Sequence, residues 1–239
     1  MFRKRSAALV YLSLLTCLVV VGGFLFLRSA FFTVQKIEID GLNRIANEEI
    51  SKLIGNVKGE NIFTIDTADL ATKIQLHPFV EQAAVERKLP STLKVAIKER
   101  KAAALIVAGE KVVEVDLSGI VLKYYEGWPK EDSPVLTGVS IPESTGPGQK
   151  VSSPEIDALM KLVGQVPPEL LPKISEISYK PSKQINLYLL NGIEVRLGYS
   201  GDYAEKIKLL NELLNSADFQ AVEKSIKYID LTAGKPVLG

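Results

Sequence analysis

Few residues in this 239-residue chain are of types that could perform chemistry. The chain has one histidine, His77, and one cysteine, Cys17. A lone histidine without neighbouring cysteines has no metal-ligand spacing. Because His77 directly precedes Pro78 at the end of a predicted helix, we expect it to cap or pack rather than catalyse. Cys17 lies inside an apolar run, so the rest of the chain can form no disulfide and no cysteine cluster for a metal.

Motifs for nucleotide binding and nucleophilic catalysis are also missing from the sequence. No glycine-rich loop ends in Lys-Ser or Lys-Thr, so residues 55–59 are interpreted as a turn. There is no Gly-x-Ser-x-Gly elbow. The acidic pairs Glu48-Glu49 and Glu131-Asp132 are interpreted as charges on solvated surface. A carboxylate pair assembled only by folding stays open as an alternative, but we expect no enzyme and no cofactor.

The charge balance excludes two further classes of function. The formal net charge is +1, without the basic excess of a nucleic-acid binder or a block of like charge suited to an acidic substrate. We therefore expect no nucleic acid as partner, and the missing catalytic set adds the expectation that there is no small-molecule substrate.

The dominant feature is residues 6–27, which contain no charged residue. As a helix this stretch would extend about 33 Å, enough to cross a hydrocarbon core of about 30 Å. Arg3, Lys4 and Arg5 precede it and only Arg28 follows directly. The excess of positive charge predicts that residues 1–5 are a cytoplasmic tail and that residues 29–239 lie outside the cytoplasm.

Three alternatives compete with a membrane span. A cleaved signal peptide has a shorter apolar core, and cleavage after Ala30 would leave Arg28 at the minus-three position. Lipoprotein processing at Cys17 would follow a poorly suited Thr16. A buried core helix would be shorter and carry a polar face. We favour the membrane span. We expect Phe31-Phe32 to lie at the membrane interface, which leaves only a short connection between the span and the domain that follows.

Residues 31–100 show the pattern of a small domain with one sheet and two helices. Val95 and Ile97 alternate with Lys94, Ala96 and Lys98, which predicts a strand with one face exposed to solvent. Asn47 and Asp66 are the predicted N-caps. The predicted order is strand 33–40, helix 47–54, helix 67–76, strand 79–87 and strand 93–99.

Residues 101–239 predict a second, mostly β domain with flanking helices, separated at residues 100–101 from the first. Residues 141–154 are rich in Pro and Gly and predict a surface loop. Two helices are expected, at 153–166 with Pro167-Pro168 as its end, and at 203–214. The predicted strands are 103–108, 111–116, 120–125, 134–138, 173–179, 184–190, 192–197 and 225–231. The whole chain is therefore α+β, with a single transmembrane helix before its two domains.

Short motifs in both regions resemble one family. The first region resembles the POTRA domain (β-α-α-β-β) of the FtsQ/DivIB family of bacterial division proteins. The resemblance lies in residues 77–80, 85–93 and 97–100, with Val85, Arg87, Leu89-Pro90 and the ending Glu99-Arg100. That family usually has a proline shortly after this arginine, where this chain has Ala102. The second region resembles the family's second domain, at residues 116–119, 136–138, 197–198, Lys206 and 228–231.

The resemblance implies a binding role for the C-terminal part of the β domain. An edge strand presents unpaired N–H and C=O groups to which a partner can add a strand, and the run 225–238 is a candidate. The alternative is that this strand pairs only inside its own sheet. By resemblance the partners are single-span coiled-coil subunits of the FtsB and FtsL type. The implied contact residues are Tyr228, Asp230, Leu231, Thr232, Ala233, Lys235 and Val237.

The resemblance implies a membrane-anchored scaffold of the cell (inner) membrane that links division subunits at the septum. A second strand edge in the POTRA domain, at 33–40 or 93–99, could serve another partner. Rival hypotheses are a POTRA component of an outer-membrane assembly or secretion system, which would need POTRA repeats and a membrane β-barrel, and a membrane-anchored envelope enzyme.

Overall fold

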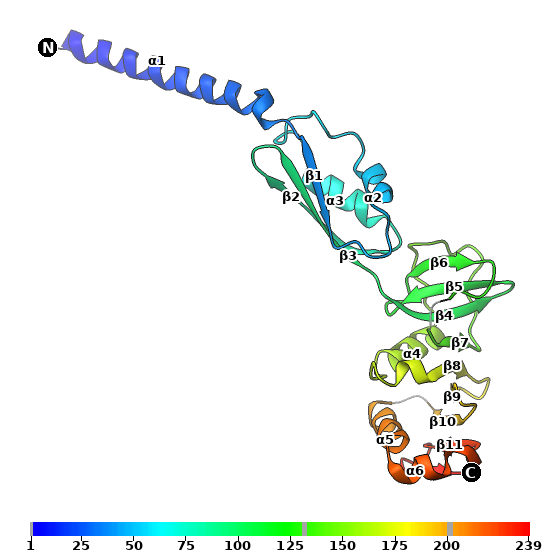
Figure 1. The fold of residues 1–239 in the computed structure, drawn as a ribbon. Helices are drawn as coiled ribbons and strands as arrows, with labels where there is room; N and C mark the ends of the chain where they lie inside the picture. Colours follow the sequence, from blue (N-terminus) through cyan, green and yellow to red (C-terminus); the bar gives the residue numbers. More distant parts are fainter. Residues whose placement is uncertain (1, 131–132, 200–202) are drawn as a thin grey trace. The chain divides into compact units, whose positions relative to one another are not determined.

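A computed structural model of the chain describes residues 2–130, 133–199 and 203–239 (Figure 1). The acidic pair Glu131-Asp132 lies outside these residues. The chain forms two compact units, Met1–Glu99 and Arg100–Gly239, and each is described by itself. The predicted α+β class with an N-terminal apolar helix is confirmed.

Helix α1 spans Phe2–Leu27 and contains the apolar run. Its segment Val10–Leu27 has a mean hydropathy of 2.5, and none of it is buried inside the structure. The alternative of a buried core helix is therefore wrong. A short 3-10 turn, Ala30–Phe32, connects α1 to the rest of the first unit.

The first unit has the predicted order of elements. They are β1 (Lys36–Asp40), α2 (Asn47–Ile54), α3 (Thr67–Gln75), β2 (Val80–Lys88) and β3 (Thr92–Glu99). The sheet order is β1-β3-β2, with β1 parallel and β2 antiparallel to β3. The prediction of 93–99 as an edge is thus wrong, because strands flank β3 on both sides. The edges of this sheet are β1 and β2.

Alternation in β3 explains the packing of this unit. Leu93, Val95 and Ile97 are buried, whereas Lys94 and Lys98 are exposed. Helices α2 and α3 bury one apolar face in the same cluster, through Ile50, Ile54, Leu70 and Ile74. Fully burying one such side chain contributes about 1.5–3 kcal/mol, so the two faces together drive this unit to fold.

One of the two predicted helix caps is confirmed. The Asp66 carboxylate accepts hydrogen bonds from the N–H groups of Ala68 and Asp69, at 2.9 and 3.1 Å, and α3 begins after it. Asn47 does not cap α2. It is already the first helical residue, and Ala46 holds the cap position in extended conformation without a side-chain bond.

Motif residues of the first unit hold distant backbone segments together. Arg87 donates to the carbonyls of Ile62 (2.8 Å) and Ile65 (2.6 Å). The Glu99 carboxylate accepts the N–H groups of residues 43, 44 and 45 at 2.8 to 3.1 Å. Burial raises the pKa of Glu99, but these hydrogen bonds outweigh it and leave the pKa below its ordinary value.

The second unit is built on one sheet, with nine strands in the described residues. Its order is β12-β11-β10-β9-β8-β7-β4-β5-β6. The strands are β4 (Ala102–Ala108), β5 (Lys111–Asp116), β6 (Val121–Tyr125), β7 (Val135–Thr137), β8 (Ile174–Tyr179), β9 (Gln184–Leu189), β10 (Glu194–Tyr199), β11 (Tyr228–Asp230) and β12 (Val237–Leu238). The helices are α4 (Pro154–Val163), α5 (Ala204–Leu214) and α6 (Ala217–Val222).

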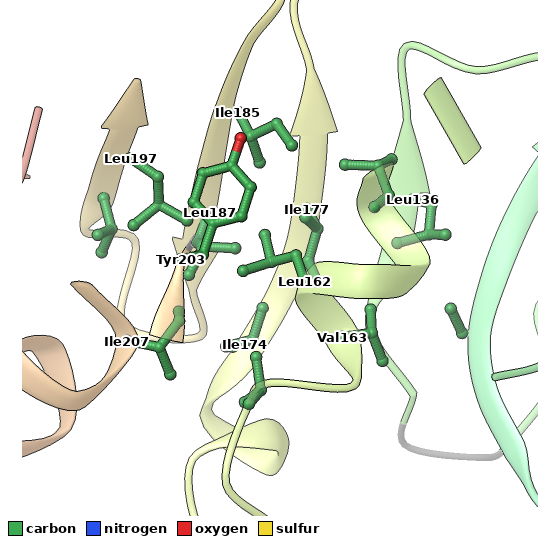
Figure 2. Close-up of a cluster of buried hydrophobic side chains, with 14 of the residues drawn as sticks. Leu136, Leu162, Val163, Ile174, Ile177, Ile185, Leu187, Leu197, Tyr203 and Ile207 are labelled. Carbon is green, nitrogen blue, oxygen red and sulfur yellow. The ribbon is translucent and has the colours of Figure 1, made fainter. Parts of the chain in front are cut away.

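The helices cover the sheet of the second unit through one apolar cluster (Figure 2). Leu162 of α4 lies beside Ile174 and Ile177 of β8, and Val163 belongs to the same cluster. Ile207 of α5 joins the same cluster, and Leu210 and Leu214 are buried with it, as their helical spacing predicts. The central strands are thereby fixed. Of the two outer strands, β6 is bonded on its outer flank by residues 148–150 through Val121, whereas β12 has only β11 beside it in the described residues.

Several predictions for this unit are wrong in detail. Helix α4 ends at Val163 with Gly164 as its C-cap, before Pro167-Pro168, because the N–H groups of Gln165 and Val166 already bond to the carbonyls three residues back. The strand predicted at 225–231 is only β11, since residues 223–225 form a 3-10 turn. Helix α6 and strand β12 were not predicted, because each is too short to show a period.

Arg100, the last residue of the POTRA motif, belongs to the second unit. Its Nη1 atom donates to Oδ2 of Asp116 at 2.8 Å. The other carboxylate oxygen, Oδ1, accepts the N–H groups of Ser118 and Ile120 and so closes the predicted turn after β5. Adjacent residues Glu99 and Arg100 are thus anchored in different units.

The bonds of Glu99 predict a pH-dependent loss of stability for Glu99→Gln. At pH 7 the substitution should lower the free energy of unfolding by about 1–3 kcal/mol, because a charged acceptor of three N–H groups is lost. The folded pKa is below the unfolded value of about 4.3, so this stabilisation is present above that value and disappears as pH falls through the folded pKa.

Urea unfolding of the whole protein in detergent, followed by circular dichroism, measures this difference. Glu86→Gln, on the exposed face of β2, is the matched control and should change stability little. An equal loss in both variants, or a difference that persists at strongly acidic pH, would contradict the assigned role of Glu99.

Candidate partner-binding edge

The candidate site is the end of the second sheet that β11 and β12 form (Figure 1). Strand β11 pairs in parallel with β10 and antiparallel with β12. The expected edge strand therefore has neighbours on both flanks, and the chain's own residues 237–238 occupy its outer side. Among the residues that the structure describes, β12 has no strand beyond it, so the open flank of the sheet belongs to β12.

The hydrogen bonds show which groups of β12 face outward. The N–H and C=O of Gly239 bond to the C=O and N–H of Tyr228, at 3.1 and 3.0 Å. Leu238 lies opposite Ile229 as the next pair along the ladder. Because bonded and non-bonded pairs alternate in an antiparallel ladder, the N–H and C=O of Leu238 point to the open flank. They are the backbone groups that an added strand would bind first.

A carboxylate turns the chain from β11 into β12. Oδ1 of Asp230 accepts hydrogen bonds from the hydroxyl (2.6 Å) and the N–H (2.8 Å) of Thr232. These two bonds lower the pKa of Asp230 below its ordinary value. Gly234 completes the reversal with a positive φ of 77° and a bond from its N–H to the Leu231 carbonyl.

A glycine and a lysine allow this turn to lie close to β10. Gly198 has a φ of +83°, and a Cβ atom there would lie 3.1 Å from Cγ2 of Thr232. Lys206 on α5 donates through Nζ to the carbonyl of Leu197 at 2.6 Å and lies 3.4 Å from that of Thr232. Three of the motif segments of this domain, 197–198, Lys206 and 228–231, therefore meet around one turn, although they are far apart in sequence.

A polar cluster lies beside β11 on β9 and β10. The Arg196 guanidinium stacks over the Tyr228 ring at 4.3 Å and donates to Glu194 at 2.9 Å. Burial raises the pKa of Glu194, but hydrogen bonds from Arg196, Tyr188 and Asn186 outweigh it and leave the pKa below its ordinary value. Tyr228 is thus held in place from the side opposite β12, which stiffens the strand under the edge.

The residues implied by the resemblance fall into three groups. Tyr228 and Asp230 are half-buried on β11, and Leu231 is fully buried in the core, so any part that Leu231 plays at this edge passes through packing. The exposed members are Thr232, Ala233, Lys235 and Val237. Leu238, whose outward backbone groups are the main feature of the edge, lies in the predicted run 225–238 but is not among the implied contact residues, because a two-residue strand gives no pattern.

His77, the other residue considered for chemistry, lies in the first unit and has a structural role. His77 lies 3.1 Å from Glu49 through Nε2, and its Nδ1 accepts the N–H of Phe79 at 3.3 Å, so it links the end of α3 to α2. Within residues 2–130, 133–199 and 203–239, no three His, Cys, Asp or Glu side chains come together where they could hold a metal ion.

Two family models match consecutive parts of the chain. Residues 32–100 match the POTRA domain of FtsQ type, and residues 104–232 match the C-terminal domain of the cell division protein FtsQ/DivIB. The second match alone covers more than half of the chain.

Several curated relatives match over most of this chain. The cell division protein FtsQ of Syntrophotalea carbinolica is 29% identical over 212 residues, which are 87% of this chain and 74% of that protein. FtsQ of an Anaeromyxobacter species is 29% identical over 239 residues, covering 95% and 80%. The cell division protein DivIB of Staphylococcus aureus is 25% identical and covers 88% of this chain but 46% of its own length.

A solved structure also matches part of the chain. It is the major extracytoplasmic domain of the trans isomer of DivIB from Geobacillus stearothermophilus, with a TM-score of 0.34 and 22% identity over 54% of this chain and 99% of that one.

An N-terminal helix long and apolar enough to cross a membrane, followed by a POTRA domain of FtsQ type and a mostly β C-terminal domain, places this chain in the class of single-helix bacterial cell division proteins. Within that class, the chain belongs to the FtsQ/DivIB family of cell division proteins.

The close approach at Gly198 predicts a local effect of Gly198→Ala. Alanine at a positive φ costs about 1–2 kcal/mol, and its methyl group would also push the turn at Thr232 away. Hydrogen–deuterium exchange should therefore speed up at the amides of residues 228–239.

Gly192→Ala is the matched control, because Gly192 has a similar φ of +87° but nothing within 4 Å of the added Cβ. It should lose similar stability without faster exchange at residues 228–239. Equal exchange in both variants would refute the role of the Gly198–Thr232 contact.

Proposed function

We propose that this protein is a non-enzymatic, membrane-anchored scaffold of the bacterial division machinery that binds partner subunits by strand addition at β12. The observation that carries the proposal is the open flank of β12, where the N–H and C=O of Leu238 have no neighbouring strand in the described residues. A partner segment in extended conformation can bond to these groups and continue the sheet.

Exposure at the edge supports this mode of binding. The side chains of Val237 and Leu238 are 57% and 37% exposed. Consecutive residues in a strand point to opposite faces, so the two side chains offer apolar contact on both sides of the added strand. Thr232, Ala233 and Lys235 extend this surface over the turn, while Tyr228 and Asp230 hold the strand beneath it.

The partner proposed for the edge is a small single-span coiled-coil subunit of the FtsB or FtsL type. Family membership supports this choice over the outer-membrane assembly alternative, because the matched relatives are cell division proteins. A backbone ladder does not require one particular partner sequence, so selectivity comes from side chains flanking the edge.

The arrangement in the envelope is proposed from the charge pattern and the helix. Residues 1–5 are a cytoplasmic tail, residues 6–27 the membrane helix, residues 31–100 the POTRA domain and residues 101–239 the partner-binding β domain. The protein would lie in the cell membrane at the division septum, with both domains outside the cytoplasm. The excess of cations before α1 supports this orientation.

Leu238→Pro tests the open flank with little change to the sheet. Proline removes the outward N–H of Leu238 but leaves the bonds between Gly239 and Tyr228, and edge strands tolerate proline on their open side. Capture of the FtsB-type partner from the same genome by the full-length protein in nanodiscs should fall about tenfold, as expected for about 1.4 kcal/mol.

Leu238→Ala keeps the N–H and should reduce capture much less. If both variants capture the partner equally well, the outward backbone group of residue 238 has no part in binding. Truncation after Leu231 removes the whole of β12 and should abolish capture, with circular dichroism showing that the remaining fold persists. Capture that survives truncation would place the site elsewhere.

A further inference from the structure

Three segments meet at the end of the first unit where α1 ends. The first is the 3-10 turn after α1, and the second is the loop 58–64. The third is the turn between β2 and β3, where the Ser91 carbonyl accepts the N–H groups of Gln35 and Lys36 at 2.8 and 3.3 Å. Side chains of two of these segments contact each other and the end of α1.

Loop 58–64 is bonded directly to the end of the apolar helix. The Asn61 side chain donates through Nδ2 to the Leu27 carbonyl at 2.7 Å, and it accepts the N–H of Phe63 through Oδ1 at 3.0 Å. Arg87, at the end of β2, holds the carbonyls of Ile62 and Ile65. The loop is therefore fixed to α1 and to the sheet at the same time.

A chain of aromatic rings continues from α1 onto this loop. The Phe32 ring lies 5.3 Å from that of Phe26 in α1, 5.0 Å from Phe31 and 5.1 Å from Phe63. Phe32 is 8% exposed and belongs to the core, contrary to the prediction that it faces the membrane interface. Phe31 and Phe63, on the outside of this chain of rings, are 57% and 42% exposed.

The exposed apolar side chains of the first unit gather at this end. Outside α1, its exposed large apolar residues in the described part are Phe31, Phe63, Leu76 and Leu89. Leu89, 56% exposed, lies in the β2–β3 turn, which is bonded through Ser91 to residues 35–36 and so lies at the same end of the unit as Phe31. Only Leu76 lies elsewhere. It follows α3 and precedes Val80, which pairs with Glu99 at the far end of β3.

The exposed apolar side chains lie directly beyond the end of α1, the helix predicted to cross the membrane. Their position relative to a bilayer therefore follows from where that helix ends. The interfacial zone of a bilayer is about 5–8 Å thick on each side of the hydrocarbon core, which is the scale of one ring contact. Phe31 lies one ring contact from Phe26, near the end of α1, and therefore falls in that zone, and Phe63, in contact with Phe32, lies at its outer boundary. Arg28, stacked over Phe24 at 4.6 Å, places a cation at the same level, where lipid phosphates lie.

We infer that Phe31, Phe63 and Leu89 insert into the lipid interface and dock the POTRA domain directly on the bilayer, in one orientation relative to α1. The partner of this surface is the phospholipid layer itself. The inference rests on the proposed membrane span but is independent of partner binding at β12.

Depth-dependent fluorescence quenching tests this surface in the full-length protein. The native tryptophan, Trp128, lies in the second unit and is replaced by phenylalanine. Single tryptophans are then introduced as Phe63→Trp, Leu89→Trp and Leu76→Trp, and each protein is reconstituted in nanodiscs with lipids brominated near the headgroup end of their chains.

Emission from the Phe63→Trp and Leu89→Trp proteins should fall about twofold relative to unbrominated nanodiscs, because both positions lie within the interfacial zone. Leu76→Trp is the matched control, exposed at 75% but separated from this end by the length of β3, about 23 Å at about 3.3 Å per residue. Its emission should not change.

Leu18→Trp, in the middle of α1, reports the span itself and should be strongly quenched in matched nanodiscs whose lipids are brominated near the methyl end of their chains. If Leu18→Trp is quenched while Phe63→Trp and Leu89→Trp are not, the docking inference is overturned and the span stands. If Leu18→Trp is not quenched, the span and the inference fail together. Equal quenching at position 76 would also overturn a docked orientation, and capture of the partner at β12 is measured separately.

Discussion

The open edge of the second sheet depends on one carboxylate, that of Asp230. By accepting the hydroxyl and the N–H of Thr232, it reverses the chain after β11 and brings residues 237–239 back along that strand. Aspartate is suited to this position because its short side chain can bond to the backbone two residues ahead. Without the reversal, β11 would be the last strand, and its own groups rather than those of Leu238 would face outward.

Much of the fold follows from short-range patterns in the sequence. The alternation in β3, the helical spacing in α5 and the cap at Asp66 are each visible within a few residues, and all are confirmed. The cap assigned to Asn47 was wrong because a favourable residue type does not decide which residue begins the helix. Local pattern determines the kind of element better than its first residue.

The candidate site was less predictable, for a physical reason. The sequence pointed to the run 225–238, but β12 has two residues and its existence depends on the turn at Asp230 and on Gly198 in another strand. The inward position of Phe32 likewise depends on Phe63 and on the core of the first unit. Contacts between residues far apart in the chain leave no period that a local reading can detect.

The motif residues that resemble the family have structural roles in both units. Arg87 and Glu99 bind backbone groups of the first unit, and Arg100 binds Asp116 in the second. Because Glu99 and Arg100 are neighbours, a single peptide bond joins two firmly held side chains. Mechanical tension applied between the two ends of the chain would therefore reach both carboxylate contacts, because no further residue separates Glu99 from Arg100. Resistance to pulling is then decided by how fast those contacts rupture rather than by the equilibrium stability of either unit.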